Sequence, residues 1–172
     1  MRAAGLAVLI LSAAHAAPAH ADVLKKGDRL AELDVAVDAN AKPARLKTYK
    51  DSWIVVTVGA EWCKPCAKEL PTWDKLAGTL HGKVTFVAID VDNEVDAGKR
   101  FHKKLKLKNM KLVYMPSDKS AVAAKYGAET MPSTFVIDPK GVVQLVKDGF
   151  DERNPDGELK SLRSALDKLG IK

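Results

Sequence analysis

Strand-like and helix-like patterns of apolar residues alternate along most of this chain. Segments 53–59 and 84–91 are almost continuously apolar and rich in β-branched residues, which indicates strands covered on both faces. Between them, apolar residues recur every three or four positions as one stripe of a helix that ends near residues 81–82: Leu70, Trp73, Leu76, Ala77 and Leu80. Residues 53–91 are therefore predicted to form a right-handed βαβ unit with parallel strands.

The flanking patterns predict that the rest of the chain extends this unit into an α/β layer structure. Residues 33–37 alternate apolar and polar side chains, and we expect them to pair with residues 44–46 as an edge hairpin. The remaining expected elements, in chain order, are a helix at 95–105, a strand at 112–115, a helix at 121–126, an antiparallel hairpin of strands 133–138 and 142–147, and an amphipathic helix at 156–169.

The first residues predict export from the cytoplasm. Arg2 precedes a short apolar run at 5–14, and small residues follow up to Ala21. Spanning a bilayer takes roughly twenty apolar residues, so the pattern is typical of a cleaved signal peptide rather than of a membrane anchor. We expect residues 1–21 to be the signal peptide and residues 22–172 to be a single soluble periplasmic domain.

The charge balance of the chain is basic, with a formal net charge of +6. No motif supports nucleic-acid binding, and a basic balance by itself accounts for solubility. The concentrated basic residues could dock an acidic partner or a membrane surface, although such a run is more often a solvated helix face: Lys103, Lys104, Lys106, Lys108 and Lys111.

The two cysteines of the chain, Cys63 and Cys66, are separated by two residues inside the predicted βαβ unit. A structural disulfide of this spacing would close a very short loop and stabilise the fold little, so the pair favours reversible thiol chemistry. A zinc site would need two more ligands. Only His81 and His102 follow the signal peptide, and we interpret both as surface histidines, so no metal site is expected.

The position of Cys63 before a helix favours its thiolate. Unpaired N–H groups and the positive end of the helix dipole would lower the pKa of this thiol, which makes Cys63 the expected nucleophile. Cys66, one turn further on and more enclosed, is the expected resolving thiol. Glu69 is either a solvated helix residue or, if partly buried, a group with a raised pKa that exchanges a proton with Cys66.

Residues 61–71, Glu-Trp-Cys-Lys-Pro-Cys-Ala-Lys-Glu-Leu-Pro, resemble the active-site segment of thioredoxin-like proteins, most closely the TlpA/ResA-like subgroup. Those proteins are exported bacterial thiol-disulfide oxidoreductases, many of which act as reductants in cytochrome c maturation. The resemblance covers roughly residues 26–168. It implies a thioredoxin-like fold with a central mixed sheet, helices on both faces, an extra N-terminal β-hairpin and a helical insertion.

The resemblance also implies roles for individual residues. Cys63 and Cys66 correspond to the nucleophile and its resolving partner, Glu69 to the acidic residue of ResA-like proteins, and Pro71 to a proline that kinks the helix. Met131 and Pro132 match the segment in which a cis proline presents the preceding backbone to an extended substrate, and we expect this segment and the residues around the cysteines to bind substrate: Trp62, Lys64, Pro65, Met131 and Pro132.

Two residues depart from the related patterns. Thr57 stands where thioredoxins place a buried aspartate, so proton transfer would use Glu69 or water. Lys64 replaces an acidic residue common in ResA-like sequences, and a cation there should favour the thiolate and make the protein somewhat less reducing.

These features favour a periplasmic oxidoreductase that needs no cofactor. It would reduce disulfides in exported proteins of the apocytochrome c type and receive electrons from a membrane thiol carrier, with transient docking at the membrane. Three alternatives stay open: an oxidase that donates its disulfide, a copper-binding or copper-delivery protein, and a thiol peroxidase. The peroxidase is disfavoured because residues 58–62 lack the Pro and Thr arrangement that peroxiredoxins place in this loop.

Overall fold

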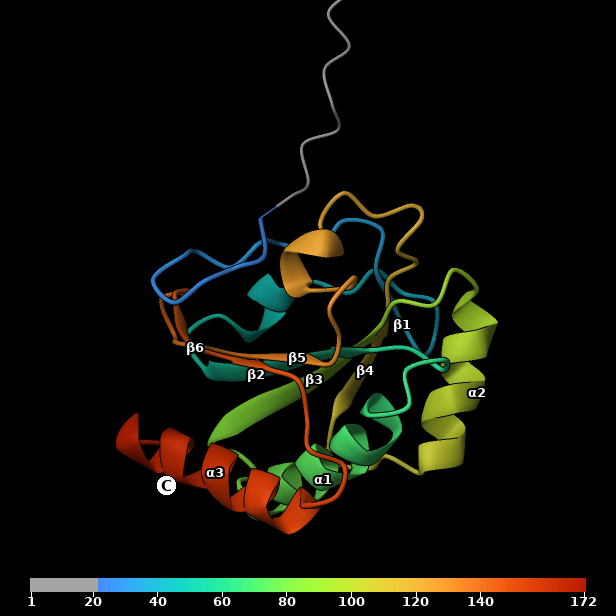
Figure 1. The fold of residues 1–172 in the computed structure, drawn as a ribbon. Helices are drawn as coiled ribbons and strands as arrows, with labels where there is room; N and C mark the ends of the chain where they lie inside the picture. Colours follow the sequence, from blue (N-terminus) through green and yellow to red (C-terminus); the bar gives the residue numbers. More distant parts are fainter. Residues whose placement is uncertain (1–21) are drawn as a thin grey trace, which may run out of the picture.

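The computed structural model describes residues 22–172, so the predicted signal peptide lies outside the described residues. The described chain forms a six-stranded sheet of order β1-β4-β3-β2-β5-β6. Figure 1 shows this mixed sheet with helices packed against it, which confirms the predicted α/β class. Its strands are β1 (Val37–Asp38), β2 (Trp53–Gly59), β3 (Val84–Asp90), β4 (Lys111–Tyr114), β5 (Ser133–Ile137) and β6 (Val143–Asp148).

The predicted βαβ unit lies at the centre of the sheet. Strands β2 and β3 are parallel along their full lengths, and helix α1 (Cys66–Thr79) connects them. Strand β4 continues the parallel part beside β3, whereas β5 pairs antiparallel with β2 and β6 pairs antiparallel with β5. The carboxyl end of β2 therefore leads directly into the two cysteines.

The strands divide the apolar core into two layers, because successive side chains of a strand point to opposite faces. In β2, Ile54, Val56 and Val58 belong to one buried cluster, while Val55 belongs to the other, which also contains both cysteines. All five residues of the predicted helical stripe in and after α1 are buried. This burial explains why the middle strands read as continuous apolar runs.

Three α-helices pack on the side of the sheet that holds the cysteines. Helices α1 and α3 (Pro155–Lys168) lie side by side on this face, and α2 (Val95–Leu105) lies along the β4 edge, as Figure 1 shows. The side chain of Asn154 caps α3 by accepting the Gly157 N–H at 3.1 Å. Among residues 22–172, none of the helices has both the length and the apolar content needed to cross a bilayer.

The opposite face is covered by short turns and by the N-terminal segment. The turns are two 3₁₀ elements, η1 (Leu46–Tyr49) and η2 (Ala124–Tyr126). The helix predicted near 121–126 is therefore present only as the single turn of η2, because Gly127 adopts a left-handed conformation (φ 73°) that ends the element.

The predicted N-terminal hairpin is present but shorter than expected. Its strand β1 holds two residues, and Val37 bridges Pro43 while the Ala44 N–H donates to the Ala36 carbonyl at 2.9 Å. Strand β1 also pairs with β4, so the hairpin joins the edge of the main sheet.

Candidate active site

The two cysteines form a disulfide at the carboxyl end of β2, just before α1. The Cys63 side chain is 5% exposed and Cys66 is fully buried, which agrees with the expectation that Cys66 is the more enclosed of the two. Cys66 packs against Gly59, where an added Cβ would lie only 3.1 Å from the Cys66 Cβ. A glycine at this last position of β2 thus allows the helix start to approach the strand closely.

The regular part of α1 begins at Cys66, three residues later than a start at Cys63 would require. The chain nevertheless turns helically from Cys63 onward, because the Cys63 carbonyl accepts the Ala67 N–H at 3.4 Å. The Cys66 N–H also points at the Cys63 sulfur, at 3.3 Å. Cys63 therefore lies where backbone N–H groups of the first helical turn can stabilise a thiolate.

The expected substrate-binding residues surround the disulfide on two segments. Trp62 is 68% exposed, an unusually open position for a large aromatic side chain, while Lys64 is exposed and Pro65 is half-buried. The Met131–Pro132 bond is cis, as the resemblance implied. Met131 packs against the cluster that contains both cysteines, and neither its N–H nor its C=O makes a backbone hydrogen bond within residues 22–172.

Glu69 is fully buried in a network of hydroxyl groups, so the alternative of a solvated helix glutamate is excluded. Thr57 donates to one carboxylate oxygen at 2.7 Å, and Thr134 donates to the other at 2.9 Å. The indole N–H of Trp73 donates to the Thr134 hydroxyl at 3.2 Å. Burial raises the pKa of Glu69, and the bonds from the two threonines oppose that rise by stabilising the charged form.

The sheet register explains how this network forms. Thr57 on β2 is paired directly with Thr134 on β5, so both hydroxyls stand on the same face of the sheet. Gly59 and Thr57 are two positions apart on β2, and they contact Cys66 and Glu69, which are three positions apart on α1. The acid therefore lies one helical turn behind the resolving cysteine, within the same buried layer.

Sequence reasoning missed Thr134 as a site residue. Strand 133–137 begins with two hydroxyl residues, Ser133 and Thr134, before three apolar ones, but that pattern does not reveal which strand lies opposite. Sequence reasoning also missed two aspartates at the carboxyl end of β3, Asp90 as its last residue and Asp92 just beyond it. Asp92 accepts the Glu61 N–H at 2.8 Å and so ties the cysteine loop to β3, and the buried Asp90 in turn accepts the Asp92 N–H at 3.1 Å.

The ionisation of Asp90 is strongly affected by its surroundings. Burial, followed by the nearby negative charge of Asp92, raises the pKa of Asp90 to about 8. One of its carboxyl oxygens has no hydrogen-bond partner among residues 22–172. At neutral pH the buried Asp90 is therefore largely a neutral acid beside the loop that carries the cysteines.

The interpretation of His102 as a surface histidine is wrong. Its side chain is 2% exposed because it lies on the inner side of α2, between the rings of Phe101 and Tyr114. His81, after α1, is exposed. Within the described residues, no three His, Cys, Asp or Glu side chains gather as a metal site would require.

Comparison with protein families gives one match that covers most of the chain. The model of the AhpC/TSA family matches residues 26–146, which include both cysteines, Glu69 and the cis proline. The matched segment also includes strands β2 and β5, on which Thr57 and Thr134 are paired.

Comparison with curated proteins finds thiol-disulfide oxidoreductases named ResA. The one from Bacillus thuringiensis subsp. konkukian is 34% identical over 116 residues, or 66% of this chain and 65% of the relative. The one from Bacillus anthracis is 30% identical over 131 residues, or 74% of this chain and 73% of the relative. The chain thus spans about 65% of the length of the first relative.

Solved structures share the fold at low sequence identity. A candidate DsbE thiol:disulfide interchange protein from Chlorobium tepidum has a TM-score of 0.69 at 22% identity, covering 83% of this chain and 99% of that one. StoA from Bacillus subtilis has a TM-score of 0.57 at 20% identity, covering 74% of this chain and 96% of that one. These similarities confirm the predicted thioredoxin-like fold.

Proposed function

The chain belongs to the AhpC/TSA family, and from that premise we propose that it is a thiol-disulfide oxidoreductase that exchanges the Cys63–Cys66 disulfide with exported proteins. One observation carries the proposal. The disulfide sits at the leading end of α1, beside an exposed tryptophan and a cis-proline segment whose preceding backbone is free to bind. The named activity of the ResA relatives supports the same reaction.

In the reductive direction, the reaction has two displacements. The Cys63 thiolate attacks one sulfur of a partner disulfide, and the other partner sulfur leaves as a thiolate that takes up a proton. Cys66, once deprotonated, then attacks the Cys63 sulfur and expels the remaining partner sulfur, which is also protonated. Two electrons pass to the partner, and Cys63–Cys66 is left as the disulfide seen in the structure.

Glu69 is the proposed acceptor for the proton of Cys66. The side chain is buried one turn behind Cys66, and burial raises its pKa toward the range in which a carboxylate accepts a proton effectively. The hydroxyls of Thr57 and Thr134 hold both carboxylate oxygens, so they fix the orientation of the acid. Proton transfer to bulk water is hindered because Cys66 is fully buried.

We further propose that the partner binds in extended form across Trp62 and Met131. The exposed Trp62 ring offers an apolar contact beside Cys63, and the free backbone groups of Met131 offer hydrogen bonds to a partner strand. Lys64 and Pro65 complete this surface between the cysteines. Contacts that are largely to the backbone would allow several partner sequences.

The cellular role that fits best is that of a periplasmic reductant in cytochrome c maturation. The signal-peptide pattern at residues 1–21 supports export, and the TlpA/ResA-like resemblance supports the reductant role. Because the periplasm is kept oxidising, such a reductant would need electrons from a membrane thiol carrier.

Trapping of the mixed disulfide tests the roles of the two cysteines. We expect the Cys66→Ser variant to accumulate a covalent adduct with a disulfide-containing protein such as insulin, because its resolving thiol is missing. The Cys63→Ser variant should not, because Cys66 is fully buried. Non-reducing electrophoresis and intact-mass measurement check this, and equal trapping by both variants would refute the assignment.

The reduction potential of the Cys63–Cys66 pair tests the direction of electron flow. A reductase should have a potential near that of thioredoxin, about −270 mV, whereas a disulfide-donating oxidase should lie near about −120 mV.

A peroxidase would instead consume hydrogen peroxide when supplied only with a small dithiol, so rapid consumption by the wild-type protein would contradict the proposed reaction.

A further inference from the structure

A groove of about 470 Å³ lies between α2 and the β4 edge, away from the disulfide. In the sheet, β3 separates β4 from the strand that leads to the cysteines. The groove has an apolar floor of Leu107, Leu112 and Tyr114. Its lysines are Lys99, Lys103, Lys106 and Lys108, the first three of which follow the spacing of one helix face.

The charges of this groove are not compensated within the described residues. Residues 22–172 contain no ion pair to any of the four lysines, and no carboxylate lines the groove. The ammonium nitrogen of Lys99 lies 6.0 Å from the centre of the Tyr114 ring. Four ammonium groups above an apolar floor thus form a concave surface suited to an anionic and partly apolar ligand.

His102 supplies a second, independent observation. His102 is one of the residues that line the groove, it is only 2% exposed, and its buried Nδ1 has no hydrogen-bond partner among residues 22–172. Nearly all buried polar groups in proteins are hydrogen-bonded, so an unpartnered one within a groove points to a partner supplied by a ligand. A carboxylate is such a partner, because it accepts from an imidazole N–H.

Favourable interaction with the helix dipole accounts for only part of the lysine cluster. Cations near a helix C-terminus are stabilising, which explains Lys103 in the last turn of α2. Lys99 lies in the first half of the helix, and Lys108 lies beyond its end. Lys106 has φ 56°, a left-handed conformation that favours glycine, so local backbone preference does not explain the lysine at this position.

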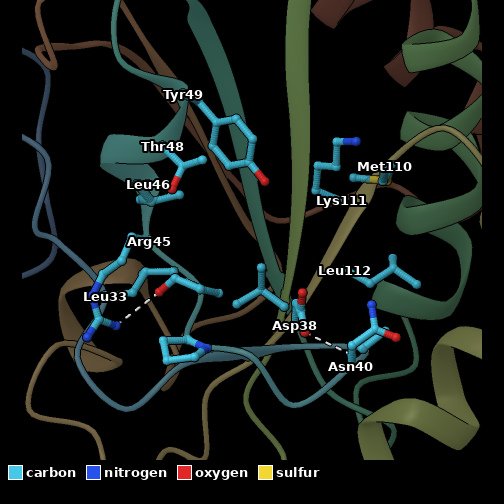
Figure 2. A pocket seen from close by; sticks show the side chains of 14 residues that line it. Leu33, Asp38, Asn40, Arg45, Leu46, Thr48, Tyr49, Met110, Lys111 and Leu112 are labelled. Carbon is cyan, nitrogen blue, oxygen red and sulfur yellow. Dashed lines mark hydrogen bonds between the residues drawn. The ribbon is translucent and has the colours of Figure 1, made fainter.

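A neighbouring hollow that shares Ala39 and Leu112 with the groove provides a contrast. Figure 2 shows two of its polar side chains, Asp38 and Arg45, in hydrogen bonds within the protein. The Asp38 carboxylate accepts the N–H groups of Asn40 and Lys42, and the Arg45 guanidinium donates to the carbonyls of Asp34 and Ala44. Two charged side chains of that hollow are therefore held by hydrogen bonds, whereas among residues 22–172 no lysine side chain of the groove has a hydrogen-bond partner.

We propose that the lysine groove binds an acidic segment of a partner polypeptide. One apolar side chain of the segment packs on Leu107, Leu112 and Tyr114. The carboxylates on either side of it bind the lysines and the imidazole of His102. A small anion would leave the apolar floor uncovered, and a bilayer surface would contact the rim rather than the concave floor. Binding here is separate from the disulfide, so it adds a docking site beyond the proposed exchange reaction.

Titration with an acidic peptide tests the proposal. The probe is the acetylated and amidated peptide Glu-Glu-Leu-Glu-Glu with a fluorescent label, measured by anisotropy against the oxidised full-length mature protein. We expect saturable binding that weakens as salt is added, because exposed charges are screened. The amide and imidazole NMR signals of His102 should shift on saturation.

Charge reversal within the groove should abolish this binding. We expect the Lys103→Glu/Lys106→Glu variant to bind the peptide at least tenfold more weakly than wild type. The Lys160→Glu/Lys168→Glu variant has the same net charge but reverses exposed lysines on α3, and it should bind as wild type does. Both variants should still reduce insulin, so a failure of docking can be distinguished from a failure of the proposed function.

Several outcomes would overturn the proposal. They are absence of peptide binding, equal loss in both charge-reversal variants, or an unshifted His102 signal at saturation. A peptide with glycine in place of leucine should bind more weakly, and equal affinity would show that the floor takes no part. Tighter binding to anionic phospholipid vesicles than to the peptide, lost in the groove variant, would make a membrane surface the occupant instead.

Discussion

At the scale of single residues, the candidate active site depends on one buried carboxyl group and its hydroxyl donors. Glu69 has both carboxylate oxygens hydrogen-bonded to threonines, on β2 and β5. Burial disfavours its charged form, while these donors favour it, so the balance between the two effects sets its pKa. Thr57 thus occupies the position of the missing aspartate and supports an acid that comes from the helix instead.

Removing one hydroxyl donor from the Glu69 carboxylate should raise the pKa of Glu69. In the Thr57→Val variant, we expect the pKa of Glu69 to rise, because valine keeps the shape of threonine but cannot donate to the carboxylate. Carbon-13 NMR titration of the Glu69 carboxyl group in the oxidised protein measures this. The control is Thr85→Val on the neighbouring β3, which should leave the pKa unchanged. A lowered or constant value in Thr57→Val would contradict the assigned hydrogen bond.

At the scale of secondary-structure elements, the placement of α2 depends on a close contact with the end of β3. Gly98 faces Asp90, and an added Cβ would lie 2.0 Å from one carboxyl oxygen. That oxygen also accepts the Asp92 N–H, so Asp90 cannot move away without losing a hydrogen bond. Glycine is normally unfavourable inside a helix, and here it is required by the distance between two packed elements.

We expect the Gly98→Ala variant to be destabilised by about 1–3 kcal/mol, the usual range for overpacking. Intrinsic helix propensity acts in the opposite direction, but favours alanine by only about 1 kcal/mol, so the steric effect should dominate. Urea unfolding monitored by circular dichroism measures the free energy of unfolding. The Ser164→Ala change at an exposed position of α3 serves as control and should have little effect. A stabilised Gly98→Ala protein would show that α2 can move freely.

At the scale of the whole molecule, two buried groups make the folding stability depend on pH. The pKa of Asp90 is raised to about 8 and that of His102 is lowered to about 4, in both cases mainly by burial. Between about pH 4 and 8, the folded state holds a proton on Asp90 that the unfolded state has lost, so stability falls as pH rises. For His102 the unfolded state holds the extra proton between about pH 4 and 6.5, so stability rises with pH.

The opposing effects of Asp90 and His102 on the pH dependence of stability largely cancel between about pH 4 and 6.5. Of these two groups, only Asp90 still affects it between pH 6.5 and 8. There, we expect wild type to lose stability relative to the Asp90→Asn variant with a slope of up to about 1.4 kcal/mol per pH unit. Urea unfolding of both proteins at several pH values gives the difference between their free energies of unfolding. The contribution of Glu69 cancels in this difference because both proteins contain that residue. A difference that stays constant from pH 6.5 to 8 would contradict the raised pKa of Asp90.

The sequence by itself determined the α/β class, the central βαβ unit and the position of the two cysteines. These features follow from local patterns, since apolar periodicity, turn residues and the Cys-x-x-Cys spacing are all read within a few consecutive residues. The shorter elements were predicted less well. The strand expected at 33–37 is reduced to the two residues of β1, and the helix expected at 121–126 is a single 3₁₀ turn because the left-handed Gly127 ends it.

Only the tertiary structure decided which polar residues meet. Thr57 and Thr134 are 77 residues apart in the chain and become partners because β2 pairs with β5. The burial of His102 likewise depends on how α2 packs against β4, and not on the residues next to it. A local pattern shows which face of an element is apolar, but the partner of a buried polar group is set by the packing of distant segments, and in this protein that packing creates both the acid network and the lysine groove.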